Sequence, residues 1–269
     1  MTWSSWWAPV FRYYPYVPGD YLPAGTRLLH VTDDPAEAAR APVGDSLLAD
    51  SRLALEGLLE RVRPGSYPAV PPRKLNRKLP EPPGPVPTPA EVFATIEAQR
   101  PDDAVILIES TSNIAEFHKS VPITRPHSFS LFGSGGLGWA LPAAVGWALA
   151  ERDIGRHRPV LCILGDGAAQ YSIQALYTAA QHRLPIVFLV LNNGEYGILK
   201  AFAKQQKTPD VPGMDLTGLD IVPIATGYGC AAFRATTPAA LAEALREALR
   251  RPGPTVLDIP ITPAVAPLL

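Results

Sequence analysis

Two short polar segments in the second half of the chain could together hold a cation. Gly165-Asp166-Gly167 follows the apolar run 160–164, and Asn192-Asn193 follows the apolar run 186–191. Asp166 and Asn193 are 27 positions apart, about one β-α-β step, and a parallel sheet brings both strand ends to its carboxyl edge. Carboxylate and amide oxygens suit a hard cation such as Mg²⁺, which commonly sits on a phosphorylated ligand. The pair therefore predicts a site for Mg²⁺ and a diphosphate cofactor.

The segments around this pair alternate between strand and helix patterns. Strands are predicted at 104–108, 160–164, 186–191 and 255–259, and helices at 137–150, 172–182 and 241–249. In the helix at 172–182 the apolar positions are Ile173, Leu176, Tyr177 and Ala180. This alternation indicates an α/β fold with a parallel sheet covered by helices on both faces.

The first part of the chain predicts a piece of another α/β domain. A strand is expected at 26–31 and an amphipathic helix at 50–61, with Leu53, Leu55, Leu58 and Leu59 as its buried set. The stretch 67–89 holds nine prolines and is expected to be a stiff linker. The predicted organisation is therefore a partial middle domain at 1–66, a linker at 67–89, and the cofactor-binding domain at 90–269.

Six segments resemble the thiamine diphosphate-dependent 2-keto acid decarboxylase family, of the benzoylformate decarboxylase type. They are Phe11-Arg12-Tyr13-Tyr14, Gly25-Thr26-Arg27-Leu28, Ala38-Ala39-Arg40-Ala41-Pro42, Glu109-Ser110-Thr111-Ser112, Gly135-Gly136-Leu137-Gly138 and Asn192-Asn193-Gly194-Glu195-Tyr196-Gly197. The likeness runs from about Pro9 to the C-terminus but covers only the second half of the usual enzyme. It implies thiamine diphosphate and Mg²⁺ as cofactors and the non-oxidative decarboxylation of a 2-keto acid.

The resemblance also assigns roles to individual residues. It implies that Asp166 and Asn193 bind Mg²⁺ through side-chain oxygens and Glu195 through its main-chain carbonyl. The residues expected around the cofactor are Thr111, Ser112, Gly135, Leu137, Gly165, Gly167, Ala168, Tyr196 and Gly197. The residues expected around the substrate are Leu131, Ile198, Leu199 and Phe202. Ile198 is bulkier than the alanine expected of a benzoylformate-specific enzyme, which predicts a preference for smaller or aliphatic 2-keto acids.

Two departures from the family predict that the chain is inactive alone. Thr88 stands where the family has a proton-transferring histidine, and threonine does not titrate near neutral pH. As local structure, Thr88 and Glu91 predict a capping box at a helix start. In the family, a glutamate in an earlier domain activates the pyrimidine end of thiamine, and that segment is absent from this sequence. We therefore assign no catalytic residue, and we expect the pyrimidine-binding domain to come from another chain of a homo- or hetero-oligomer.

Other readings stay open. The chain could be a subunit of a two-chain decarboxylase, an inactive remnant, a fragment of an acetolactate synthase-like carboligase, or a non-catalytic binding module. The match of 133–138 to the dinucleotide pattern G-x-G-x-x-G is discounted, because 128–132 predicts a poor strand and Glu151 follows too closely.

Composition excludes several other classes. The net charge of −1 gives no case for nucleic acid or an anionic membrane surface. No apolar run reaches the ~18 residues of a membrane span, and the N-terminus lacks the features of a signal peptide. Cys162 and Cys230 are too few for a disulfide framework. We therefore expect a cytoplasmic location.

Overall fold

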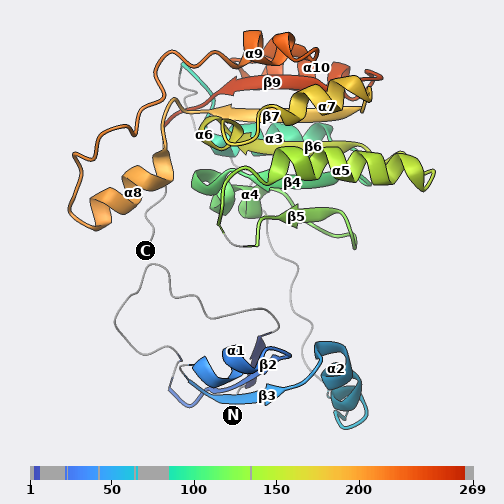
Figure 1. Ribbon diagram of the computed structural model, residues 1–269, viewed down its shortest axis with the longest axis vertical. Helices are drawn as coiled ribbons and strands as arrows, with labels where there is room; N and C mark the ends of the chain where they lie inside the picture. The colour runs from blue at the N-terminus through green and yellow to red at the C-terminus, as the bar shows by residue number, and fades with distance from the viewer. Residues whose placement is uncertain are drawn as a thin grey trace. The chain divides into compact units, whose positions relative to one another are not determined.

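The computed structural model describes residues 3–6 (backbone only), 22, 24–41, 43–63, 65, 85–133 and 135–263. The chain divides into two compact units, Met1–Pro72 and Arg73–Leu269 (Figure 1). Most of the predicted linker at 67–89, and Ser134 in the glycine-rich loop, lie outside the described residues. No helix in the described ranges is long and apolar enough to cross a bilayer.

The first unit is a small parallel sheet with two helices. Its strands lie in the order β1 (Trp3–Trp6), β2 (Arg27–Thr32) and β3 (Asp45–Leu48). Helix α1 (Pro35–Arg40) follows β2, and helix α2 (Ser51–Leu59) follows β3. The strand predicted at 26–31 and the helix predicted at 50–61 are both confirmed.

The predicted burial of the leucine stripe on α2 is wrong. Leu53, Leu55, Leu58 and Leu59 are all exposed, with Leu59 at 78%, and no residue of α2 is buried. An amphipathic pattern shows that a helix has an apolar face, but burial requires a second layer to cover that face. In the described part of this unit, nothing covers the stripe.

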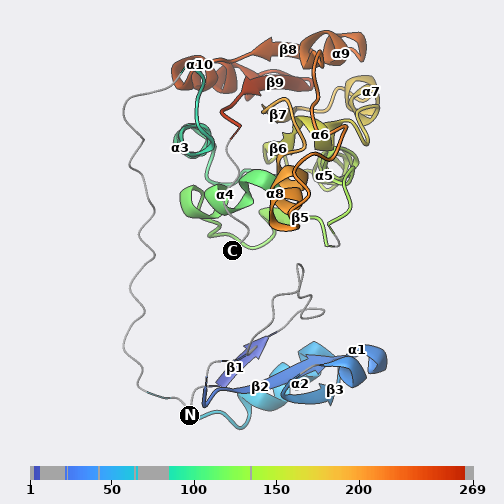
Figure 2. The ribbon, with the colours of Figure 1, turned by 90° about the vertical axis from the view of Figure 1, so that its left-hand side faces the viewer.

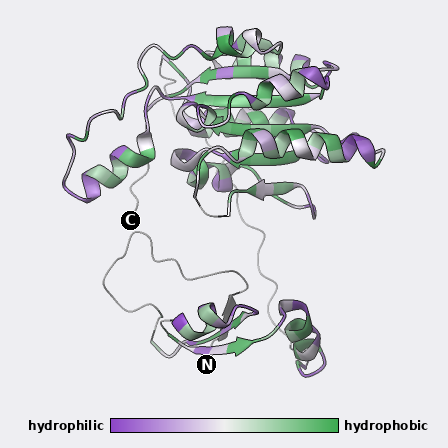
Figure 3. Cartoon of the chain, viewed as in Figure 1, coloured by the Kyte–Doolittle hydropathy of each residue, from purple (hydrophilic) through white to green (hydrophobic). Residues whose placement is uncertain are grey.

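The second unit is built on six parallel strands. Their order across the sheet is β5 (Phe129–Leu131), β4 (Val105–Glu109), β6 (Val160–Gly165), β7 (Ile186–Asn192), β9 (Thr255–Pro260) and β8 (Ala231–Arg234). The four inner strands are almost entirely buried and apolar, as expected of a parallel sheet covered on both faces (Figure 3). All four strands predicted for this region are confirmed.

Helices cover both faces of this sheet (Figures 1 and 2). One layer contains α3 (Pro89–Gln99), α4 (Ile114–Ser120) and α10 (Pro238–Ala248), and the opposite layer contains α5 (Ala140–Asp153), α7 (Ala175–Gln181) and α9 (Ile221–Gly227). Alternate residues of a strand face the two layers, so Phe188 packs into one apolar cluster and Leu189 into the other. Three short elements lie at the strand ends, namely η1 (Thr111–Asn113), α6 (Asp166–Ala169) and α8 (Gly197–Gln205).

The structure differs from the sequence-based expectation in three details of this unit. The helix predicted at 137–150 begins only at Ala140, because Gly138 has a φ of +99° that a helix cannot contain. Tyr177, expected on the apolar face of its helix, is 56% exposed. The segment 128–132, expected to be a poor strand, contributes the short edge strand β5.

Candidate functional site

The two polar segments identified in the sequence meet at the carboxyl edge of the second sheet. Gly165 pairs with Leu191 in the β6–β7 register, so Asp166 and the Asn192-Asn193 pair leave the sheet side by side. The Asp166 carboxylate joins the two loops. Its Oδ1 accepts a hydrogen bond from the Gly167 N–H at 2.9 Å, and its Oδ2 accepts one from the Gly194 N–H at 2.8 Å.

Asp166 is a buried anion without a cationic partner among the described residues. The residue is 2% exposed, and burial raises the pKa of Asp166 to about 6, against the opposing effect of the Gly167 and Gly194 N–H groups. Two neutral N–H donors offset only part of the cost of removing a carboxylate from water. The site therefore has the electrostatic character of a place for a cation.

The other two predicted metal ligands lie in the loop that follows β7. Asn193 Oδ1 accepts a hydrogen bond from the Glu195 N–H at 3.3 Å, which folds the loop into a tight turn. The Glu195 side chain forms an ion pair with Lys200, which also contacts Asp215 Oδ1 at 2.5 Å. With its carboxylate engaged there, Glu195 is suited to offer its main-chain carbonyl instead.

The backbone pairing of this loop fits that use. The Glu195–Asp215 bridge is flanked by hydrogen bonds from the Tyr196 N–H to the Met214 carbonyl and from the Leu216 N–H to the Gly194 carbonyl, both at 2.8 Å. The two bonds do not use the Glu195 carbonyl. Within the described ranges no group of three or more His, Cys, Asp or Glu side chains could hold a metal. The predicted set has one carboxylate, one amide and one main-chain oxygen, so it is not such a group.

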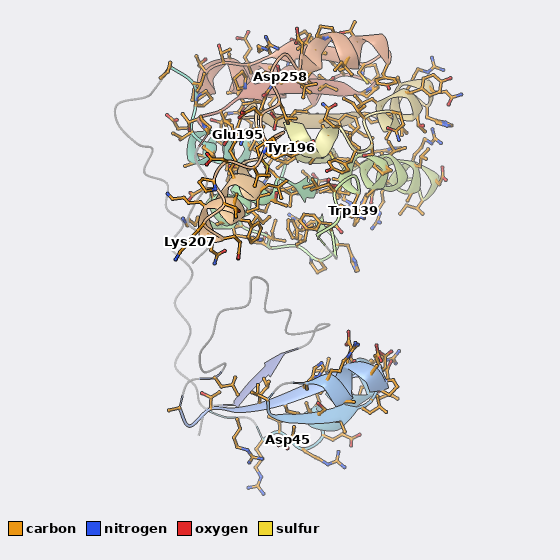
Figure 4. The ribbon with its side chains drawn as sticks, turned by 60° about the vertical axis from the view of Figure 1, so that its left-hand side comes forward. Asp45, Trp139, Glu195, Tyr196, Lys207 and Asp258 are labelled. Carbon is orange, nitrogen blue, oxygen red and sulfur yellow. The ribbon has the colours of Figure 1, made fainter. Side chains whose placement is uncertain are left out.

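Tyr196 packs against the start of α6 and makes glycine necessary there. A Cβ atom added at Gly167 would lie 2.6 Å from the Tyr196 ring, closer than real Cβ contacts come. Glu195 and Tyr196 lie next to each other in the segment between β7 and α8 (Figure 4). Gly167 thus brings its backbone, with no side chain, to the point where a diphosphate is expected.

Glu109 begins one of the six resembling segments, but it was given no role from the sequence. It ends β4 at the same edge and is 1% exposed. Its Oε1 accepts a hydrogen bond from the Gly138 N–H, and its Oε2 accepts one from the Ala140 N–H, both at 2.6 Å. Glu109 therefore fixes the loop that contains Gly135 and Leu137 and also stabilises the N-terminus of α5. The sequence feature that could have identified Glu109 is an acidic residue at the end of an apolar strand, just before Thr111 and Ser112.

Asp258 is a second missed residue. It is fully buried in β9, where its Oδ1 accepts a hydrogen bond from Asn192 Nδ2 at 3.0 Å and its Oδ2 one from Arg234 Nε at 2.8 Å. Asn192 is thereby held toward β9 through its Nδ2, while its Oδ1 accepts a hydrogen bond at 3.2 Å from the Gly194 N–H that also donates to Asp166.

The other predicted residues are distributed around this edge. Thr111 and Ser112 form η1 directly after β4, and α8, with Ile198, Leu199 and Phe202, contacts η1. Leu199 is 43% exposed. Leu131 ends the edge strand β5 and is 42% exposed, separated from β7 by two strands. The substrate-contact role of these four residues stays a prediction.

Thr88 has the predicted structural role. Its Oγ1 accepts a hydrogen bond from the Glu91 N–H at 3.3 Å, and the Thr88 N–H donates to Glu91 Oε2 at 2.7 Å. This capping box at the start of α3 is confirmed.

Comparison with known proteins identifies the second unit. A family model described as "Thiamine pyrophosphate enzyme, C-terminal TPP binding domain" matches residues 110–259. The benzoylformate decarboxylase of Pseudomonas aeruginosa PAO1 is 48% identical over 259 residues, which is 94% of this chain and 47% of the relative. The acetolactate synthase of Bacillus subtilis 168 is 33% identical over 125 residues, which is 46% of this chain and 21% of the relative.

A solved structure agrees with this assignment. The benzoylformate decarboxylase of Polynucleobacter necessarius superposes with a TM-score of 0.89 at 41% identity, covering 97% of this chain and 49% of that one. The chain thus spans about half the length of the benzoylformate decarboxylases that it matches. It belongs to the thiamine pyrophosphate enzymes and carries their C-terminal cofactor-binding domain.

Proposed function

We propose that this chain supplies the diphosphate- and Mg²⁺-binding half of a thiamine diphosphate-dependent decarboxylase acting on a 2-keto acid of the benzoylformate type. The family match supports the cofactor. The identity of 48% to a benzoylformate decarboxylase, against 32% and 33% to proteins named as acetolactate synthases, supports decarboxylation over carboligation. The observation that carries the proposal is the buried Asp166 carboxylate beside Asn193, which accepts hydrogen bonds from the Gly167 and Gly194 N–H groups and has no cationic partner in the described part of the chain.

The residues present fit both groups. Asp166, the Asn193 side chain and the Glu195 carbonyl would hold Mg²⁺, because all three provide the oxygen atoms that this ion prefers. The backbone N–H groups of Gly167 and Ala168, at the start of α6, would face the diphosphate. Thiamine diphosphate, when bound, supplies the carbanion chemistry that releases CO₂. The chain's own contribution would be to position the diphosphate end, and Glu109 fixes the glycine-rich loop at the same edge of the sheet.

Proton transfer must come from elsewhere in the assembly. The Thr88 hydroxyl lies 2.8 Å from Glu91 Oε2 in the capping box, and threonine does not titrate near neutral pH, so it cannot serve as a general acid or base. We therefore propose that turnover requires a pyrimidine-binding domain, supplied by another chain or by the remainder of a longer protein. The isolated chain would bind the cofactor without converting substrate.

The substrate preference follows from Ile198. This side chain is half-buried on α8, which contacts η1 next to the cofactor-binding residues. A branched residue in the pocket takes up volume, so we propose a shift toward smaller or aliphatic 2-keto acids, worth ~1–3 kcal/mol of discrimination. Steady-state kinetics of the complemented enzyme on phenylglyoxylate and on an aliphatic 2-keto acid would test this. An undiminished preference for the aromatic acid would contradict it.

Cofactor binding is tested by calorimetric titration of thiamine diphosphate into the isolated chain, with and without Mg²⁺. Binding should depend on Mg²⁺ and should be lost in Asp166→Ala, while Asp210→Ala, an exposed aspartate outside the site, should bind as the wild type does. Unchanged binding in Asp166→Ala would refute the metal site.

Turnover is tested by adding the N-terminal half of a benzoylformate decarboxylase such as the Pseudomonas relative. CO₂ release from phenylglyoxylate should appear only in the mixture. Release by the chain alone at enzyme-like rates would refute its proposed inactivity.

A further inference from the structure

The second unit contains a cavity at the edge of the sheet opposite the cofactor site. Its volume is about 260 Å³, and it lies where β6 and β7 begin, between the end of α5 and the turn after α7. Along β6, Val160 at the cavity and Gly165 at the cofactor edge are five residues apart, roughly 17 Å at about 3.3 Å per residue. The cavity therefore belongs to a different place on the molecule from Asp166 and Asn193.

Positive charge dominates the wall of this cavity. Four arginines line it (Arg152, Arg156, Arg158 and Arg183), against one carboxylate, Glu151. Glu151 is already engaged, because its Oε1 is 2.5 Å from Arg158 Nη2 and 3.2 Å from Arg156 Nη2, and its Oε2 accepts from Arg158 Nε at 3.1 Å. Glu151 is thus engaged by Arg156 and Arg158, and Arg152 is paired with Asp153, its Nε 3.6 Å from Asp153 Oδ1. Of the four arginines in the wall, these ion pairs leave Arg183.

Of the four arginines in the cavity wall, Arg183 is the one whose side chain is not engaged by a carboxylate of the described residues. Among the described residues its guanidinium has no hydrogen bond or ion pair, and it lies at the surface. Arg183 has a φ of +50° and lies in the turn that ends α7. In this turn the Arg183 N–H donates to the Ala180 carbonyl, and the Leu184 N–H donates to the Ala179 carbonyl, both at 3.0 Å. Glycine is the usual residue at this position of a helix end. The turn thus places Arg183, with no side-chain partner among the described residues, in the wall of the cavity.

Much of the remaining wall is apolar. Ala148, Leu184, Val187 and Leu249 contribute carbon surface. The volume is just below the range of about 300–1,000 Å³ that is usual for drug-sized ligands, so a single-ring acid fits and a nucleotide does not. A guanidinium recognises a carboxylate through two parallel hydrogen bonds. We propose that this cavity binds a small organic carboxylate with an apolar body, and that Arg183 holds the carboxylate.

The proposal is independent of the cofactor site and is tested without thiamine diphosphate or Mg²⁺. Benzoate is titrated into the isolated chain, followed by calorimetry and by amide chemical shifts in NMR spectra. We expect saturable binding to one site, with the largest shifts around Leu184, Val187 and Leu249. Benzamide, which has the same shape but no charge, should bind at least tenfold more weakly. Equal binding of benzamide, no saturable binding of benzoate, or shifts confined to the carboxyl edge would each overturn the proposal.

The sharpest variant is Arg183→Gly, with Lys207→Gly as its matched control. Lys207 has a φ of +59° and closes α8 with the same pair of hydrogen bonds, but it lies outside the cavity. Both variants put glycine where the backbone favours it, so both should fold at least as stably as the wild type. Arg183→Gly should weaken benzoate binding at least tenfold, and Lys207→Gly should leave it unchanged. Equal binding by Arg183→Gly and the wild type would overturn the assignment.

Discussion

Asp166 and Glu151 are both buried carboxylates, and their environments shift their pKa values in opposite directions. Asp166 lies at the carboxyl edge of the sheet and is 2% exposed, while Glu151 lies near the amino edge and is 4% exposed. Among the residues that the structure describes, Asp166 has only backbone N–H partners, and burial raises its pKa to about 6. Glu151 is bound by Arg158, which lowers the pKa of Glu151 despite burial. The ion pair with Arg158 therefore outweighs the effect of burial at Glu151, whereas the backbone N–H groups around Asp166 do not outweigh it.

This difference separates the chemistry of the two edges. The carboxyl edge has a buried anion with no cationic partner in the described ranges, which supports the proposed Mg²⁺ site. The cavity wall at the amino edge has four arginines and one carboxylate, which supports the proposed carboxylate site. The helices and strands between them are common to both edges, so the contrast arises from the residues at the strand and helix ends.

The largest effect is expected from Glu109→Ala, which removes a carboxylate held only by backbone N–H groups. The N–H groups of Gly138 and Ala140 would lose their acceptors in a buried place, so the second unit should lose about 4 kcal/mol of unfolding free energy. Urea denaturation measures this. Glu116→Ala, which removes an exposed ion pair with Lys119, is the control and should cost less than about 1 kcal/mol. A similar cost for both variants would show that Glu109 does not fix the glycine loop.

The next effect concerns the pH dependence of Asp166 in the chain without Mg²⁺. Its pKa is raised from 3.8 to about 6, so the folded state binds the proton more tightly than the unfolded state does. Its contribution to stability is therefore fully present below pH 3.8 and is lost as the pH rises through 6, by up to about 3 kcal/mol. The unfolding free energies of the wild type and Asp166→Asn should be compared between pH 4 and pH 7. The wild type should lose stability relative to the variant as the pH rises, and parallel curves would contradict this.

A smaller effect is expected from Gly167→Ala. The new methyl group would clash with the Tyr196 ring at 2.6 Å, and overpacking of this kind costs ~1–3 kcal/mol. Gly165→Ala is the matched control, because a Cβ atom there meets nothing within 4 Å. Adding Tyr196→Ala should relieve most of the cost of Gly167→Ala in a double-mutant cycle. Additive costs in thermal denaturation would show that the two residues do not pack together.

Much of the second unit could be predicted from sequence because its strands are continuous apolar runs. These runs, and the turns after them, were sufficient to place Asp166 and Asn193 at one edge. Glu109 and Asp258 were missed because their partners are distant in sequence, as with Glu109 and Gly138, 29 positions apart. Periodicity describes how one element faces its surroundings and carries no information about such pairs. The α2 leucines show the same limit, since their spacing predicted an apolar face but not what covers it.

The smallest effect is expected from Glu151, near the amino edge of the sheet. It concerns the acid branch of the stability curve, which is the change of the unfolding free energy with pH below 4.5. Because Arg158 lowers the pKa of Glu151, the pair contributes stability above the ordinary pKa of 4.5, and this is lost as the pH falls through the lowered value. Glu151→Gln should therefore flatten the loss of stability below pH 4.5, opposite in direction to the change at Asp166. Glu247→Gln, which alters an exposed pair with Arg251, is the control and should leave the acid branch unchanged. If the acid branch is as steep in Glu151→Gln as in the wild type, Arg158 does not stabilise the charged Glu151 carboxylate. The contrast between the two edges would then rest on Asp166 alone.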